Sequence, residues 1–128
     1  MSTAWLIRPA AWTLSLAPPA NIDVIEVDVA SDDLYTLVAE REIIITSDIH
    51  LGAAFLQRCR WIRGIIGVGD RSREVVDLAF ARHAGLQAEV IPGVEVNASV
   101  LEQVVTSHRR IEEHLRGLDD IAEHWEGT

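Results

Sequence analysis

The chain has 128 residues, of which 48% are hydrophobic and 24% are charged, and these proportions are ordinary for one globular domain. Its net charge of −9 argues against DNA or RNA as a partner, because nucleic-acid-binding proteins usually carry a basic face. The sequence contains one cysteine, Cys59, and no lysine, so an internal disulfide, a cysteine-based zinc site and Schiff-base chemistry are excluded.

The first elements alternate between strands and short helices. Residues 4–7 are apolar, 23–29 alternate between β-branched apolar and acidic side chains, and 42–46 contain a continuous run of isoleucines; all three segments predict strands. Between the second and third, Ser31 is a candidate N-cap for a short helix with two aspartates in its first turn. The region 11–17 fits neither pattern clearly.

The middle of the chain continues this alternation. Residues 53–59 predict a short helix, 62–67 a strand, 72–83 a helix that stops at Gly85, and 87–91 a strand. Strands and helices that alternate at this spacing predict an α/β fold, with a parallel sheet and helices on both faces. Ligands of such sheets usually bind beyond the carboxyl ends of the strands.

The last segment predicts a long C-terminal helix. Ser99 and Glu102 have the spacing of a capping box. From there, positions in alternating steps of three and four residues, all apolar except His108, form a heptad seam; they are Leu101, Val104, His108, Ile111, Leu115, Leu118, Ala122 and Trp125. We therefore divide the chain into an α/β body, 1–98, and a helical arm, 99–128, and expect a homodimer through the arm. The alternative is two shorter helices broken at Gly117 and folded back on the sheet.

Two motifs for metal-dependent hydrolysis are incomplete. The run from Ser47 to Gly52, with Asp48 and His50 two residues apart, resembles the first motif of calcineurin-like metallophosphoesterases, but the later ligands of a two-metal site are missing. The sequence from Ile91 to Glu95 resembles one motif of the PHP-type metal hydrolases, whose His-x-His cluster is also missing. We expect no metal site.

Residues 42–103 hold a longer ordered set of motifs. They run from Thr46-Ser47 through Gly67-Val68-Gly69-Asp70, Val76-Asp77-Leu78, Gly85 and Pro92-Gly93 to a helix with Glu102-Gln103. In order and in most spacings this set resembles the substrate-binding domain of the D-2-hydroxyacid dehydrogenases. The resemblance implies a flavodoxin-like parallel sheet, with a substrate carboxylate held by backbone N–H groups at Gly67, Val68 and Gly69.

The resemblance and the strand ends together give the candidate ligand-binding residues: Thr46, Ser47, Gly67, Val68, Gly69 and Arg71. Clustered N–H groups beside glycines can form an anion-binding nest. The family's first-loop arginine falls on Thr46 and its helix histidine on Gln103. No GxGxxG motif for a nucleotide occurs, so we expect no cofactor and no catalytic residue in this chain.

Three functions fit these observations. The first is a non-catalytic binding protein, a truncated dehydrogenase relative that holds a peptide or carboxylate-bearing ligand for a partner enzyme in biosynthesis. The second is the substrate-binding subunit of a split NAD-dependent oxidoreductase. The third is a structural dimerisation module without a ligand. We take the first as the working hypothesis.

Overall fold

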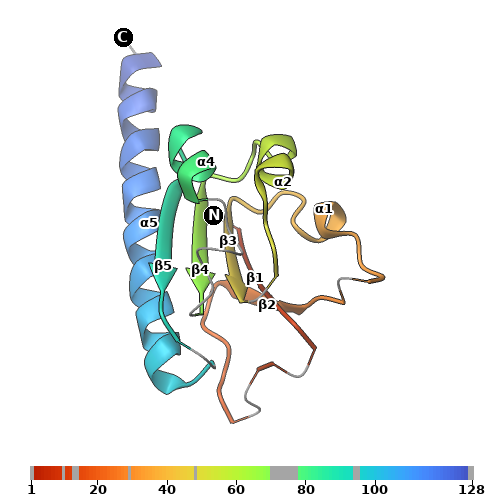
Figure 1. The fold of residues 1–128 in the computed structure, drawn as a ribbon. Helices are drawn as coiled ribbons and strands as arrows, with labels where there is room; N and C mark the ends of the chain where they lie inside the picture. Colours follow the sequence, from red (N-terminus) through yellow and green to blue (C-terminus); the bar gives the residue numbers. More distant parts are fainter. Residues whose placement is uncertain are drawn as a thin grey trace.

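The computed structural model describes residues 2–9, 11–12, 15–28, 30–47, 49–69, 78–93 and 96–126, with the side chains of 123–126 left out. Its elements are β1 (Thr3–Ile7), β2 (Ile22–Glu26), α1 (Leu34–Leu37), β3 (Ile43–Ser47), α2 (Ala53–Arg58), β4 (Gly64–Val68), α4 (Leu78–His83), β5 (Gln87–Ile91) and α5 (Ala98–Glu126). Figure 1 shows how they are arranged.

The five strands form one sheet in the order β2-β1-β3-β4-β5, and every neighbouring pair is parallel. Helices α1, α2 and α4 pack against one face, while α5 and the β1–β2 connection pack against the other (Figure 1). The prediction of an α/β, flavodoxin-like sheet with helices on both faces and a long C-terminal helix is confirmed. No helix of the described residues is long and apolar enough to span a membrane.

Two cores follow from the alternation of side chains along each strand. In β3, Ile44 lies in the core under α1, α2 and α4, whereas Ile43 and Ile45 lie in the core under α5. In β1, Trp5 belongs to the α5 side, where its ring meets Trp12 of the β1–β2 connection edge to face at 4.9 Å. The connection therefore shields the part of this face that α5 does not reach.

Several predicted boundaries shift. The second strand ends at Glu26, three residues before the predicted end. The N-cap of α1 is Asp33, whose side chain accepts a hydrogen bond from the N–H of Tyr35, and the prediction of Ser31 as the cap is wrong. The predicted helix 72–83 appears as α4 from Leu78, and residues 72–77 lie outside the described part of the chain. Gly85 ends α4 as predicted, with a φ of +84°.

Helix α5 is continuous over 29 residues, so the alternative of two helices broken at Gly117 is wrong. The capping-box prediction is also wrong, because the helix begins at Ala98 and Asn97 accepts the hydrogen bond from the N–H of Val100 at 2.9 Å. The helix lies close to the sheet: a Cβ on Gly64 would come within 2.8 Å of the Ile111 side chain.

The predicted seam of α5 is used mostly inside the molecule. Its residues Val104, His108, Ile111 and Leu115 are at most 5% exposed and pack against the sheet, whereas Leu118 is 45% exposed. Beyond Leu115, α5 leaves the body and continues past the ends of the strands (Figure 1). Residues 98–115 thus belong structurally to the α/β body, and the free arm is shorter than the predicted segment 99–128.

Candidate functional site

The carboxyl ends of all five strands lie along one edge of the sheet, because the strands are parallel (Figure 1). In this sheet β1 lies between β2 and β3, and the chain runs from β1 to one side and from β3 to the other. The topological switch point is therefore between β1 and β3, and open α/β sheets usually bind ligands there.

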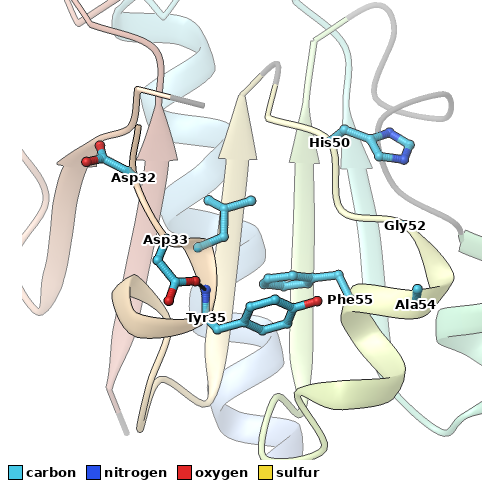
Figure 2. Close-up of a pocket in the computed structure, with 8 residues that line it drawn as sticks. Asp32, Asp33, Tyr35, His50, Gly52, Ala54 and Phe55 are labelled. Carbon is cyan, nitrogen blue, oxygen red and sulfur yellow. Dashed lines mark hydrogen bonds between the residues drawn. The ribbon is translucent and has the colours of Figure 1, made fainter. Parts of the chain in front are cut away.

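A pocket of about 480 Å³ opens beside this switch point. Its walls come from two segments, one that follows β2 and one that follows β3 (Figure 2). The residues that line it are Asp32, Asp33, Leu34, Tyr35, His50, Gly52, Ala54 and Phe55.

Two aromatic rings form one wall of the pocket. The rings of Tyr35 and Phe55 stack at a centroid distance of 5.2 Å, as Figure 2 shows, and the guanidinium of Arg58 lies over the Tyr35 ring at 5.6 Å. Phe55 is buried in the core, while Tyr35 is 37% exposed. The wall is therefore an apolar surface, and its Tyr35 ring already contacts one guanidinium.

Two carboxylates lie at the rim. One oxygen of Asp33 accepts from the N–H of Tyr35 and the other from the hydroxyl of Thr36, both at 3.0 Å. Asp32 accepts from the N–H of Asp28 at 2.8 Å. All these donors are neutral, so they fix the carboxylates in place without cancelling their charge. The rim is negatively charged and suits a cationic group of a ligand.

His50 stands on the other side of the pocket, across from the acidic rim (Figure 2). A Cβ on Gly52 would lie 3.1 Å from His50 Nε2, so glycine leaves the imidazole the space it occupies. Among the residues that the structure describes, no three metal-binding side chains come together. Asp48, the partner of His50 in the metallophosphoesterase-like motif, lies outside those residues.

Thr46 and Ser47 lie at the carboxyl end of β3, but their hydroxyls serve the fold. The Thr46 hydroxyl donates to the carbonyl oxygen of Ile49 at 2.8 Å, and Ser47 Oγ accepts from the indole N–H of Trp5 at 3.0 Å. Both residues are buried, and consecutive side chains of a strand point to opposite faces. The structure therefore does not bring these two hydroxyls to one side of a ligand.

Gly67 and Val68 belong to β4, which is paired on one side with β3 and on the other with β5. The N–H of Gly69 donates to the carbonyl oxygen of Ile91 at 2.9 Å. Gly69 has a φ of +124°, a conformation that favours glycine. Because the N–H of Gly69 is already bonded to Ile91, a nest of free N–H groups would have to involve residues beyond Gly69. Arg71 lies outside the described residues, and the carboxylate site stays a prediction.

The lone thiol is in a different environment. Cys59 is 1% exposed, and burial raises its pKa above the ordinary value of a thiol. A buried, protonated thiol is a poor nucleophile, and Cys59 packs among apolar side chains of the core.

The pocket residues were not among the candidates from the sequence, although His50 was considered as a metal ligand. Asp33 and Tyr35 are separated from His50 and Phe55 by a whole strand in the sequence. The signal that could have found them is the switch-point rule, but applying the rule requires the strand order.

Comparisons with known proteins give no relative: the chain matches no family model, no curated protein and no solved structure. The resemblance to the dehydrogenase substrate domain therefore stays a prediction. The function has to be argued from the geometry of the carboxyl edge.

Proposed function

We propose that this chain is a cytoplasmic binding protein without catalytic activity of its own, which holds a peptide or another carboxylate-bearing ligand for a partner enzyme. The observation that carries the proposal is the pocket of about 480 Å³ at the switch point. Its volume is within the range of roughly 300–1,000 Å³ that is typical of small-molecule sites. It is large enough for one or two amino-acid residues.

The chemistry of the pocket supports a peptide. The Tyr35–Phe55 wall offers apolar contact, and Asp32 and Asp33 offer negative charge for an amine or a guanidinium. Gly69 follows β4, the neighbour of β3 along the same edge, and is where the carboxylate is expected to bind. A peptide carries both kinds of group on one extended molecule, so it can contact both positions.

The two aspartates of the rim suit the binding of a ligand better than they suit acid–base catalysis. The Asp33 carboxylate is held by the N–H of Tyr35, which it caps, and the Asp32 carboxylate by the N–H of Asp28, so both carboxylates are preorganised to attract a cation. The ligand would then be presented at an open edge, where a partner enzyme can reach it.

An NMR titration with tripeptides tests this function. The ¹⁵N-labelled protein is titrated with Ala-Arg-Ala, Ala-Leu-Ala and Ala-Glu-Ala, each with free ends. We expect saturable shifts of the amides of 32–35 and 50–55, with Ala-Arg-Ala binding most tightly and Ala-Glu-Ala least. Titrations in which none of the three peptides shifts these amides at millimolar concentration would contradict the proposal.

Charge-removing variants give the matched control. Asn keeps one acceptor oxygen at each position, enough for the N–H of Tyr35 and of Asp28, and at position 33 its amide NH2 can donate to the Thr36 hydroxyl. Asp32→Asn/Asp33→Asn should therefore weaken Ala-Arg-Ala about tenfold and leave the fold unchanged. Glu102→Gln/Asp120→Asn removes the same charge at exposed positions of α5 and should leave the affinity unchanged. Equal affinities in both double variants would place the peptide elsewhere.

We also propose that the protein is a homodimer that associates through α5. The support is the part of α5 beyond Leu115, where large apolar side chains remain exposed outside the body. Burial of one large aliphatic side chain contributes roughly 1.5–3 kcal/mol, so these side chains favour association with a partner.

A further inference from the structure

Arg58 is the last residue of α2, and its guanidinium contacts the aromatic wall of the pocket. Its Cζ lies 5.6 Å from the centre of the Tyr35 ring, which is a cation–π contact. Tyr35 lines the pocket, and both Tyr35 and Arg58 are exposed. The positive charge of Arg58 therefore lies at the surface, beside the wall on which a ligand of the pocket would rest.

The Arg58 guanidinium has no carboxylate partner among the described residues. Other arginines there pair with a carboxylate of the same chain; among them are Arg41, Arg63, Arg110 and Arg116. A cation–π contact uses the face of the guanidinium and leaves the N–H donors along its edge for another group. Because a guanidinium binds a carboxylate through two parallel N–H···O bonds, the edge of Arg58 suits a carboxylate of a ligand.

Opposite charges therefore flank Tyr35. The carboxylate of Asp33 accepts from the backbone N–H of Tyr35 at 3.0 Å, and the guanidinium of Arg58 lies over the ring of the same residue. Asp32 adds a second negative charge on the side of the pocket where Asp33 lies (Figure 2). A ligand that lies along Tyr35 meets carboxylates near the backbone of this residue and a guanidinium near its ring, which suits a ligand with both kinds of charge.

The carboxylate position expected at Gly69 offers a ligand less. The N–H of Gly69 already donates to Ile91, and Gly67 and Val68 belong to a strand that is paired on both sides. In the described part of that loop, residues 67–69, there is no cationic side chain. A guanidinium supplies a permanent positive charge and several donors, so Arg58 is the stronger partner for a carboxylate among the described residues near the pocket.

We propose that Arg58 binds the carboxylate of the pocket's ligand, while Asp32 and Asp33 bind its cationic group and Tyr35 contacts the apolar part between them. The inference rests on the peptide-binding function proposed above and adds the residue that selects the carboxylate. It also narrows the class of ligand to a short peptide whose basic residue lies close to a free carboxyl end. Gly69 is the alternative position for this carboxylate, and the experiment below separates the two.

Amidation of the peptide tests the carboxylate. Ala-Arg-Ala with a free carboxyl end and the same peptide with an amidated end are titrated into the ¹⁵N-labelled full chain, and the amides of 32–35 are followed. Amidation removes a negative charge from the peptide. Because the chain has a net charge of −9, electrostatic attraction alone would make the amidated peptide bind more tightly. Binding through Arg58 predicts the reverse, with the amidated peptide about tenfold weaker.

Arginine variants identify the residue. Arg58→Gln should weaken Ala-Arg-Ala about tenfold without weakening the amidated peptide, which also shows that the pocket is intact. Arg58→Lys keeps the charge but not the paired donors and should fall between. Arg60→Gln removes the same charge at a nearby exposed position and should leave the ratio of the two affinities unchanged. Light scattering should give every variant the same mass, about twice 14.2 kDa for the homodimer proposed above.

The outcomes separate this inference from the proposed function. An unmodified protein that binds neither peptide overturns peptide binding and the role of Arg58 together. If both peptides bind and the amidated one is not weaker, only the role of Arg58 is overturned. The same holds if amidation weakens binding equally in Arg58→Gln, because the carboxylate then binds elsewhere, such as at Gly69 or His50. An amidation effect that disappears in Arg58→Gln and persists in Arg60→Gln supports the inference.

Discussion

The imidazole of His108 joins α5 to β1 and is 5% exposed. Its Nδ1 lies 3.1 Å from a carboxylate oxygen of Glu112, and its Nε2 lies 2.7 Å from the hydroxyl of Thr3. The carboxylate can only accept, so Nδ1 carries the proton and Nε2 accepts from Thr3. The neutral ring therefore satisfies both of its nitrogens.

This arrangement predicts a loss of stability in mild acid. Burial lowers the pKa of His108, and the nearby Glu112 carboxylate opposes that effect only in part. The unfolded chain takes up a proton as the pH falls below about 6.5, whereas the folded protein does not until its lower pKa is reached. The free energy of unfolding should therefore be unaffected by this group above about pH 6.5 and decrease below it.

Urea unfolding between neutral pH and pH 5 measures the effect. His108→Gln removes the titrating group, so this component of the pH dependence should disappear. His114→Gln, at an exposed position of the same helix, should retain the full dependence of the unmodified protein. The interpretation fails if His108→Gln and the unmodified protein lose stability in parallel over this range.

At the scale of elements, the start of α5 decides which side chain caps the helix. Asn97 and Ser99 are both residue types that cap helices, and the Ser99–Glu102 spacing imitates a capping box. In the structure the first helical residue is Ala98, so Ser99 already lies inside the first turn. The Asn97 side chain satisfies the N–H of Val100 instead.

The two positions should therefore respond differently to alanine. Asn97→Ala should lower the free energy of unfolding by about 1 kcal/mol, the usual contribution of an N-cap. Ser99→Ala should have little effect, because its hydroxyl caps no backbone N–H of the described residues. Denaturant midpoints of the two variants measure the difference. A larger loss of stability in Ser99→Ala than in Asn97→Ala would support the capping box instead.

At the scale of the whole molecule, the pocket depends on how the strands are ordered. The segments after β2 and β3 approach each other because β1 lies between these strands in the sheet. Helix α5 packs on the opposite face of the sheet. A ligand site and an association surface can therefore exist on one small chain without competing.

The whole chain should not bind a nicotinamide nucleotide. Its sequence has no GxGxxG turn leading into a helix, which is the arrangement that receives the pyrophosphate of such cofactors. Calorimetry with NAD and NADP, oxidised and reduced, should show no saturable heat at millimolar cofactor. Saturable binding would favour the alternative in which this chain is a subunit of an oxidoreductase.

The local sequence pattern alone was enough to predict the type of most helices and strands of this protein. The apolar β-branched runs of β3 and β4 and the three- and four-residue periodicity of α5 are properties of neighbouring residues, so their type was predictable. Gly85 was predictable as the end of α4 for the same reason. The α/β class follows from the order of these elements, and the structure confirms it.

Long-range packing decided the rest. The hydroxyl of Ser47 is used by Trp5, which is 42 residues away, and the seam of α5 is covered by the sheet of its own chain. The pocket exists only because the strand order brings His50 near Asp33. The sequence shows which side chains are polar or apolar. Which of these side chains contact each other depends on how the strands pair, because the contacts join distant parts of the chain.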